Sequence, residues 1–160
     1  MIKVNNYNSF ERVSGTMIGG GTLLGLSNLL TGVNDFDTIK ELSKKGDHSK
    51  VDMLVRDIYG DSSPIKGLHG DLLASSFAKV AYDNEFDAKL RFNENLGKKY
   101  SKEDILSSLV FMVSFNIGQL AYLTSQLHSI NKLYFIGNYI RDHDLAMQRI
   151  NFGVEFMSRS

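Results

Sequence analysis

The order of apolar and polar residues predicts a protein built mostly of helices, with extended segments near its N-terminus. Residues 2–7 alternate weakly between apolar and polar, and residues 10–16 resume the same pattern, which is typical of two strands. Residues 133–136 form a short, continuously apolar run, as in a buried parallel strand. Apolar residues at helical spacing predict helices at residues 21–31, 35–45, 50–59, 72–80, 101–127 and 142–157.

Glycines and polar residues mark where several of these helices begin and end. Gly32, Gly46 and Gly60 each follow a helical stretch, as expected of helix C-termini. Ser101 stands three residues before Asp104, a spacing that predicts a capping box at the start of the longest helix. Gly118 lies inside that helix, where glycine costs roughly 1 kcal/mol relative to alanine, so we expect close approach of another backbone there.

The most distinctive stretch is the glycine-rich loop at residues 12–25. Gly19, Gly20 and Gly21 precede a strongly apolar helix, so backbone N–H groups and the positive end of the helix dipole point at one spot. Such a spot suits an anion, most plausibly a phosphate. The loop is not a P-loop, because no Gly-Lys-Ser/Thr follows at the required spacing. The alternative is a glycine turn that lets the helix pack tightly on a strand.

Arg12 and a second glycine turn are further candidates for a ligand site. Arg12 precedes the glycine loop, where its guanidinium can hold a carboxylate or phosphate, although a surface arginine fits the pattern equally. Gly137 and Asn138 follow the predicted strand at 133–136, and open α/β sheets bind ligands outside the carboxyl ends of their strands. The sequence Asp-His-Asp at 142–144 imitates a metal cluster but is better explained as a helix N-terminus, so we predict no metal ligands.

Composition narrows the class of protein. The chain has 160 residues, enough for one domain, and its 18 basic residues balance 18 acidic ones without any basic block, which argues against nucleic acid as a partner. It has no cysteine, which excludes disulfides and thiolate chemistry. We expect no apolar run of membrane-spanning length, and no signal peptide is evident, so we expect a soluble cytoplasmic protein without a membrane partner. The sequence has neither paired carboxylates nor a Ser/His/Asp order, so it predicts no self-contained catalytic centre.

Several blocks, in order along nearly the whole chain, resemble the eukaryotic-type (type II) pantothenate kinases. They are residues 12–25, 29–32, 46–60, 74–77, 101–104, 116–118 and 135–141. The resemblance implies an α/β fold, the ribonuclease-H-like lobe of the actin/hsp70/sugar-kinase superfold, with residues 1–160 as one partial domain, the C-terminal lobe. It also implies ATP-dependent, Mg²⁺-assisted phosphorylation of pantothenate to 4′-phosphopantothenate in coenzyme A synthesis, a reaction that depends on positioning and electrostatics.

The resemblance assigns roles to individual positions. Arg12 matches the family arginine near the transferred phosphate, and the glycines 19–21 match the nucleotide-side loop. Gly137 and Asn138 match the turn beside the adenosine. The helix at 101–127 matches the homodimer interface, and acyl-CoA is expected as a feedback ligand. The residues matching the pantothenate or acyl-CoA pocket of the partner subunit are Ile58, Tyr59, Leu73 and Ala74.

The chain also departs from the family pattern. A first phosphate loop, a catalytic glutamate and a Gly-Ser-Gly strand precede the matching region in the family, and a glycine-rich segment follows it; residues 80–99 look longer than the family loop. We therefore expect a fragment that is inactive by itself. The rival hypothesis is a catalytically silent paralogue that binds acyl-CoA or forms a scaffold dimer. A weaker one is an acetate- or sugar-kinase-like enzyme of the same superfold.

Overall fold

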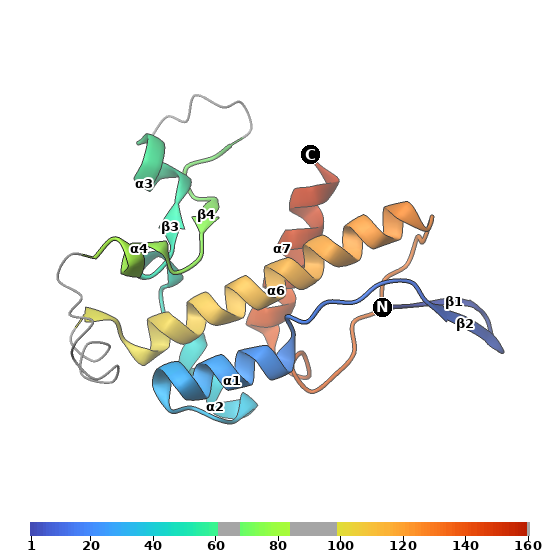
Figure 1. Cartoon of the computed structure of the whole chain (residues 1–160), viewed down its shortest axis with the longest axis horizontal. Coiled ribbons are helices and arrows are strands. Elements are labelled where there is room, and N and C mark those ends of the chain that lie inside the picture. The colour runs from blue at the N-terminus through green and yellow to red at the C-terminus, as the bar shows by residue number, and fades with distance from the viewer. Residues whose placement is uncertain (61–67, 84–98, 160) are drawn as a thin grey trace. The chain divides into compact units, whose positions relative to one another are not determined.

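The computed structural model describes residues 1–60, 68–83 and 99–159, and Figure 1 shows the order of its elements. The chain forms two compact units, Met1–Leu24 with Val110–Ser160 and Gly25–Leu109. The fold is mixed α/β and rich in helix, as predicted. The described elements are β1 (Ile2–Asn6), β2 (Ser9–Arg12), α1 (Gly20–Thr31), α2 (Phe36–Ser43), the 3₁₀ helix η1 (His48–Lys50), β3 (Met53–Leu54), α3 (Val55–Tyr59), β4 (Leu73–Ser75), α4 (Ala78–Ala81), α6 (Lys102–Leu127) and α7 (Asp144–Ser158).

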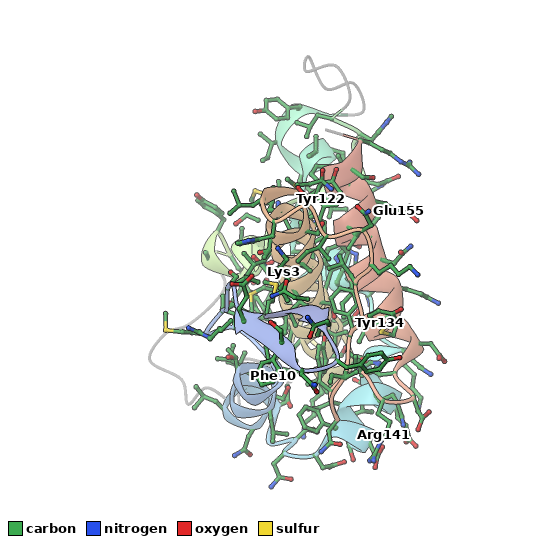
Figure 2. The ribbon with its side chains drawn as sticks, turned by 90° about the vertical axis from the view of Figure 1, so that its right-hand side faces the viewer. Lys3, Phe10, Tyr122, Tyr134, Arg141 and Glu155 are labelled. Carbon is green, nitrogen blue, oxygen red and sulfur yellow. The ribbon has the colours of Figure 1, made fainter. Side chains whose placement is uncertain are left out.

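The first unit begins with the antiparallel hairpin β1–β2, which confirms the two predicted strands. Val4 pairs with Phe10 across the hairpin, and Lys3 pairs with Glu11 in the neighbouring register position. Because side chains alternate between faces along a strand, Val4 and Phe10 share one face while Lys3 lies on the other, and Figure 2 labels Lys3 and Phe10 on this ribbon. The Lys3 ammonium lies 3.9 Å from the Glu11 carboxylate. The hairpin thus has one charged face and one exposed apolar face.

Two glycines bring α7 against the second half of α6, where the two helices cross (Figure 1). A Cβ at Gly118 would overlap the carbonyl of Ile150, and one at Gly153 would lie 2.6 Å from the Phe115 oxygen. This confirms the close approach predicted at Gly118. Aromatic rings fill the adjacent space, with ring centroids 5.8 to 6.5 Å apart, namely Phe111, Phe115, Phe152 and Phe156.

In the second unit, polar side chains define the ends of the helices. Asp35 caps α2 by accepting a hydrogen bond from Thr38 N at 2.8 Å. Ser101 caps α6 by accepting from Asp104 N at 3.1 Å, as the capping box predicts. In a complete capping box the Asp104 carboxylate would accept from the backbone N–H of Ser101. Here it accepts from Asp47 N at 2.7 Å instead. This bond ties the start of α6 to the chain that follows α2.

Two predicted helices of this unit are wrong. Residues 50–59 form the end of η1, then β3 and the short α3, while residues 72–80 contain β4 and the start of α4. The reason is pairing between distant segments: Met53 pairs with Ser75, and Leu54 pairs with Leu73. Local helical spacing cannot reveal such pairing, which favours extended backbone at both places. The polar stretch 83–99 predicts an exposed excursion, and its residues 84–98 lie outside the described residues.

The predicted buried strand at 133–136 is also wrong. These residues are non-regular, and Tyr134 (Figure 2) and Ile136 are 82% and 93% exposed. A buried strand needs hydrogen-bonding neighbours, and the described residues pair no strand with this segment. Helix α1 is also less buried than its sequence indicates. A helix that is apolar on most faces is expected to be buried, but only part of α1 is, because Leu23 is buried and Leu29 is 70% exposed.

Helix α6 corrects the expectation that no apolar run reaches membrane-spanning length. By length and composition it could cross a bilayer, since an 18-residue window has a mean hydropathy of 1.5. However, 61% of that window is buried inside the protein. Burial of this extent is typical of the core helix of a globular domain, which passes the same test.

Candidate functional site

The segment formed by residues 12–22, called here the glycine loop, joins β2 to α1. Arg12 ends β2 and is exposed, and its guanidinium folds back over the loop, because a Cβ at Gly15 would lie 2.7 Å from an Arg12 terminal nitrogen. Val13 N donates to Met1 O at 3.1 Å and so holds the loop's beginning beside β1. Arg12 and the loop backbone are therefore neighbours, as the sequence predicts.

Threonine hydroxyls hold the rest of the glycine loop. Thr22 Oγ1 donates to Met17 O at 2.9 Å and accepts from Gly19 N at 3.3 Å. Thr16 Oγ1 accepts from Ile18 N at 3.0 Å. These bonds set the backbone at the start of α1, where the first helical N–H groups have no intrahelical acceptor.

The space beside the loop glycines is open. A Cβ placed on Gly19 or on Gly21 would meet no atom within 4 Å. The alternative explanation, that these glycines serve tight packing of the helix on a strand, therefore has no support at these two positions. Helix-start amides, an open backbone and a nearby guanidinium form an arrangement that can bind an anion.

The glycine loop is poorly suited to a metal cation. Residues 12–22 contain no Asp or Glu, whereas Mg²⁺ is bound through carboxylates and phosphates. Among the described residues, no group of three or more His, Asp or Glu side chains could hold a metal ion. His143 has a different task, because its Nδ1 accepts from Ala146 N at 3.3 Å and caps α7. This confirms that residues 142–144 start a helix.

The second predicted turn, at Gly137 and Asn138, is present, but residues 133–136 before it form no strand, so the expected crevice at the carboxyl end of a strand is not formed there. Gly137 has φ +136°, and its carbonyl accepts from Arg141 N at 3.2 Å. The following Tyr139 is buried, and its hydroxyl lies in hydrogen-bonding contact with Ser114. Burial raises the pKa of Tyr139 to about 12, although the bond to Ser114 opposes the rise. In the described part of the chain no recorded hydrogen bond or ion pair joins this turn to the glycine loop, so their joint site stays a prediction.

The four predicted pocket residues belong to the second unit, on α3 and β4. Val55 N donates to Leu72 O, and Arg56 N donates to Gly70 O, both at 2.9 Å, so these segments are bound to each other. Ile58 and Tyr59 on α3 are 51% and 45% exposed. On β4, Leu73 is half-buried and Ala74 is exposed. We call Ile58, Tyr59, Leu73 and Ala74 the α3–β4 surface.

One charged residue corrects the sequence-based interpretation. The place of Asp52 in a predicted helix with basic residues nearby indicates a solvated charge, and the structure buries it instead. Asp52 is fully buried and accepts hydrogen bonds from His48 Nδ1 at 3.1 Å, from Phe77 N at 2.9 Å and from the Ser108 hydroxyl. A buried charge requires such partners. The partners Phe77 and Ser108 are 25 and 56 residues away, so no local motif signals them.

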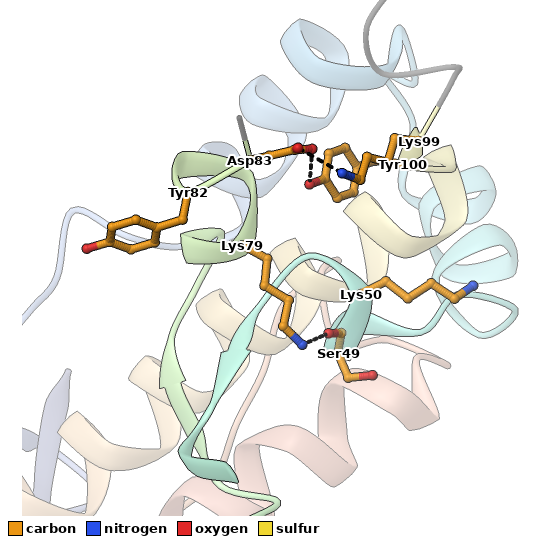
Figure 3. A pocket seen from close by; sticks show the side chains of 7 residues that line it. All are labelled: Ser49, Lys50, Lys79, Tyr82, Asp83, Lys99 and Tyr100. Carbon is orange, nitrogen blue, oxygen red and sulfur yellow. Dashed lines mark hydrogen bonds and ion pairs between the residues drawn. The ribbon is translucent and has the colours of Figure 1, made fainter. Parts of the chain in front are cut away.

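A hollow of about 740 Å³ in the same unit is lined by charged and aromatic side chains (Figure 3). The lining residues are Ser49, Lys50, Lys79, Tyr82, Asp83, Lys99 and Tyr100. Carboxylates already pair the lysines: Lys50 with Asp104 at 3.3 Å, Lys79 with Asp57 at 2.8 Å and Lys99 with Asp83 at 2.7 Å. Tyr82 points away from Lys79 in Figure 3. The lysines around the hollow therefore form local ion pairs and do not converge on one point as they would in an anion-binding site.

Three carboxylates around this network are stabilised in their charged form. The ammonium of Lys79 and the backbone N–H of Leu54 lower the pKa of Asp57. The Ser49 hydroxyl lowers the pKa of Asp47. At Asp104 desolvation raises the pKa, but the hydrogen bonds from Asp47 N and other donors outweigh it, so the net shift is downward.

Comparison with known proteins finds relatives that match almost the whole of this chain. A relative from Arabidopsis thaliana named pantothenate kinase 2 is 46% identical over 162 residues, and the pantothenate kinase of Schizosaccharomyces pombe is 41% identical over 160. A mouse protein named 4′-phosphopantetheine phosphatase is 41% identical over 159 residues. Each alignment covers 99% of this chain but only 17%, 37% and 18% of the respective relatives. The Fumble family profile matches residues 1–160, and the chain belongs to that family.

Proposed function

We propose that the chain is part of a pantothenate kinase that transfers phosphate from ATP to pantothenate. The observation that carries the proposal is the match of the whole chain to the Fumble family together with an open glycine loop beside Arg12. Relatives from a plant and a yeast are named pantothenate kinase. In this proposal the two-unit chain contributes to an actin/hsp70/sugar-kinase fold.

The glycine loop supplies what phosphoryl transfer needs from this chain. The backbone amides in the first turn of α1 and the guanidinium of Arg12 are hydrogen-bond donors, and they would bind the phosphate oxygens as charge moves during transfer. Mg²⁺, which such a reaction uses to neutralise phosphate charge, would need ligands from elsewhere, because residues 12–22 offer no carboxylate. The Gly137–Asn138 turn would bind the nucleotide.

The remaining parts of the proposal concern assembly and regulation. The α3–β4 surface would line a pantothenate or acyl-CoA pocket across a homodimer formed through α6, with acyl-CoA as a feedback ligand and a cytoplasmic location. The support is the half-exposed apolar character of Ile58 and Tyr59, which a ligand or partner would cover.

A second function is favoured by one specific observation. The mouse relative named a phosphatase is as similar to this chain as the yeast kinase is, 41% in each case. The same module therefore occurs in a protein that is named for a different activity. In this second proposal the module binds acyl-CoA or forms a scaffold dimer without catalysing the kinase reaction.

A turnover assay separates the two proposals. The complete protein that contains these residues is incubated with ATP and labelled pantothenate, and 4′-phosphopantothenate is quantified. Arg12→Ala is expected to lower kcat by about 10²–10³, the usual loss when one charge-stabilising donor is removed. Lys3→Ala is the matched control, because Lys3 is a cation on the opposite face of the same hairpin.

Two results would go against the kinase. Turnover that Arg12→Ala leaves unchanged would remove Arg12 from the reaction. Acetyl-CoA binding without any turnover in the unmodified protein would support the second proposal instead.

A further inference from the structure

Asp52 connects three segments of the second unit that are far apart in the sequence. Its carboxylate contacts His48 in η1, the backbone of Phe77 between β4 and α4, and Ser108 in α6. The side chain is fully buried, so water does not compete for these bonds. A buried carboxylate with several donors fixes the relative positions of the groups that supply them.

The Phe77 contact lies at a strained position. Phe77 has φ +59°, in the left-handed region that a bulky side chain rarely adopts. Such a conformation persists only where surrounding contacts enforce it. Its N–H donates to Asp52, and two residues later Lys79 N donates to Val51 O at 3.1 Å. The backbone on each side of the turn is thus tied to the segment that contains Asp52.

The turn at Phe77 sets where β4 ends, and β4 carries half of the α3–β4 surface. Leu73 pairs with Leu54, which immediately precedes α3. A shift of β4 along β3 would therefore displace Leu73 and Ala74 relative to Ile58 and Tyr59. A one-residue slip would also turn each β4 side chain to the other face.

We infer that Asp52 is a positioning residue for ligand binding at the α3–β4 surface, acting through the Phe77 turn and anchored to α6 by Ser108. The inference rests on the proposed function, in which that surface binds an acyl thioester. Asp52 itself touches no ligand in this arrangement. Its effect is to hold β4 in one register against β3.

Ser108→Ala tests the inference more safely than removal of the carboxylate, which risks unfolding. The matched control is Ser107→Ala, a neighbouring buried serine of α6 with no role in the inference. The first measurement is hydrogen exchange at the Phe77 amide, followed by NMR on the labelled 160-residue chain. The exchange rate is expected to rise roughly tenfold in Ser108→Ala and to stay unchanged in Ser107→Ala. A tenfold change corresponds to the loss of about one hydrogen bond to a charged group.

Ligand binding is measured in parallel on the complete protein with acetyl-CoA as the probe. Ser108→Ala is expected to weaken binding about tenfold. Asp52→Asn is expected to weaken it less than Asp52→Ala, because the amide oxygen of asparagine still accepts the Phe77 N–H bond. This rescue by the conservative variant is not expected of a side chain that only fills space.

The outcomes distinguish the inference from the proposed function. Leu73→Asp alters the surface directly and serves as the reference. If Leu73→Asp abolishes acetyl-CoA binding but Ser108→Ala leaves it unchanged, the inference fails and the surface assignment survives. If neither change affects binding, the surface assignment fails and the inference with it. Unchanged exchange at Phe77 in Ser108→Ala would refute the tether itself.

Discussion

Replacing Gly118 with alanine tests the contact between α6 and α7. The added methyl group would occupy the space of the Ile150 carbonyl and of the atoms bonded to it. That neighbour is backbone in the middle of α7, so it cannot move aside as the end of a side chain can. The two helices would have to separate, and the phenylalanine rings packed between them would lose contact.

The magnitude follows from two opposing terms. Alanine in a helix interior is favoured over glycine by about 1 kcal/mol. Overpacking costs about 1–3 kcal/mol, and contact with rigid backbone places Gly118 at the upper end of that range. We therefore expect a net loss of about 2 kcal/mol in the free energy of unfolding and a fall of roughly 4–8 °C in Tm.

Gly25 in α1 provides the matched control. It is also a helical glycine, but a Cβ there would meet nothing within 4 Å. Gly25→Ala should therefore stabilise by about 0.5–1 kcal/mol. Urea and thermal unfolding followed by circular dichroism compare both variants with the unmodified chain. A Gly118→Ala protein as stable as Gly25→Ala would refute the described helix contact.

Two further predictions concern the second unit. Gly46→Ala should destabilise by about 2 kcal/mol, because its methyl group would overlap the Glu103 carbonyl; an unchanged urea midpoint would exclude that contact. The pKa of Asp57 is lowered from 3.8 in the folded chain, so its contribution to stability is present above pH 3.8 and is lost as the pH falls through the lower folded value. Asp57→Asn should be less stable than the unmodified chain at pH 7 and should lose less further stability on acidification. Urea midpoints at pH 7 and pH 3 measure both effects. An equal loss on acidification in the variant and in the unmodified chain would contradict this role of Asp57.

Helices whose signals are local were predictable from the sequence. Helix α1 and the long α6 begin and end within a residue or two of the predicted bounds, because apolar spacing and end signals act over one or two turns. Gly32 and Gly46 both followed predicted helices, yet for different reasons. Gly32 has φ +77°, whereas Gly46 is required by the nearby backbone of Glu103.

Features that depend on distant partners were not predictable. Helical spacing in residues 50–59 places Val51, Leu54, Val55 and Ile58 on one apolar stripe. The first three are buried, but Ile58 is 51% exposed, and pairing with β4 replaces the expected helix. The candidate functional residues also differ in whether a local sequence signal indicates them. Arg12 and the glycine loop are adjacent in the chain, so the sequence alone nominates them, and their role in binding stays a prediction. The contacts of Asp52 come from Phe77 and Ser108, which no short motif connects to it.

The hairpin β1–β2 has a consequence for the proposed role of Arg12. A ribbon of only two strands is marginally stable in water, and its apolar face, with Val4 and Phe10, is uncovered in this structure. Arg12 is the last residue of that ribbon, so motion of the ribbon also moves its guanidinium. Stabilising a phosphoryl transition state requires donors that are already fixed in place. If Arg12 binds the transferred phosphate as proposed, a partner segment that covers Val4 and Phe10 would raise the reaction rate without touching a reactant, by holding Arg12 in place.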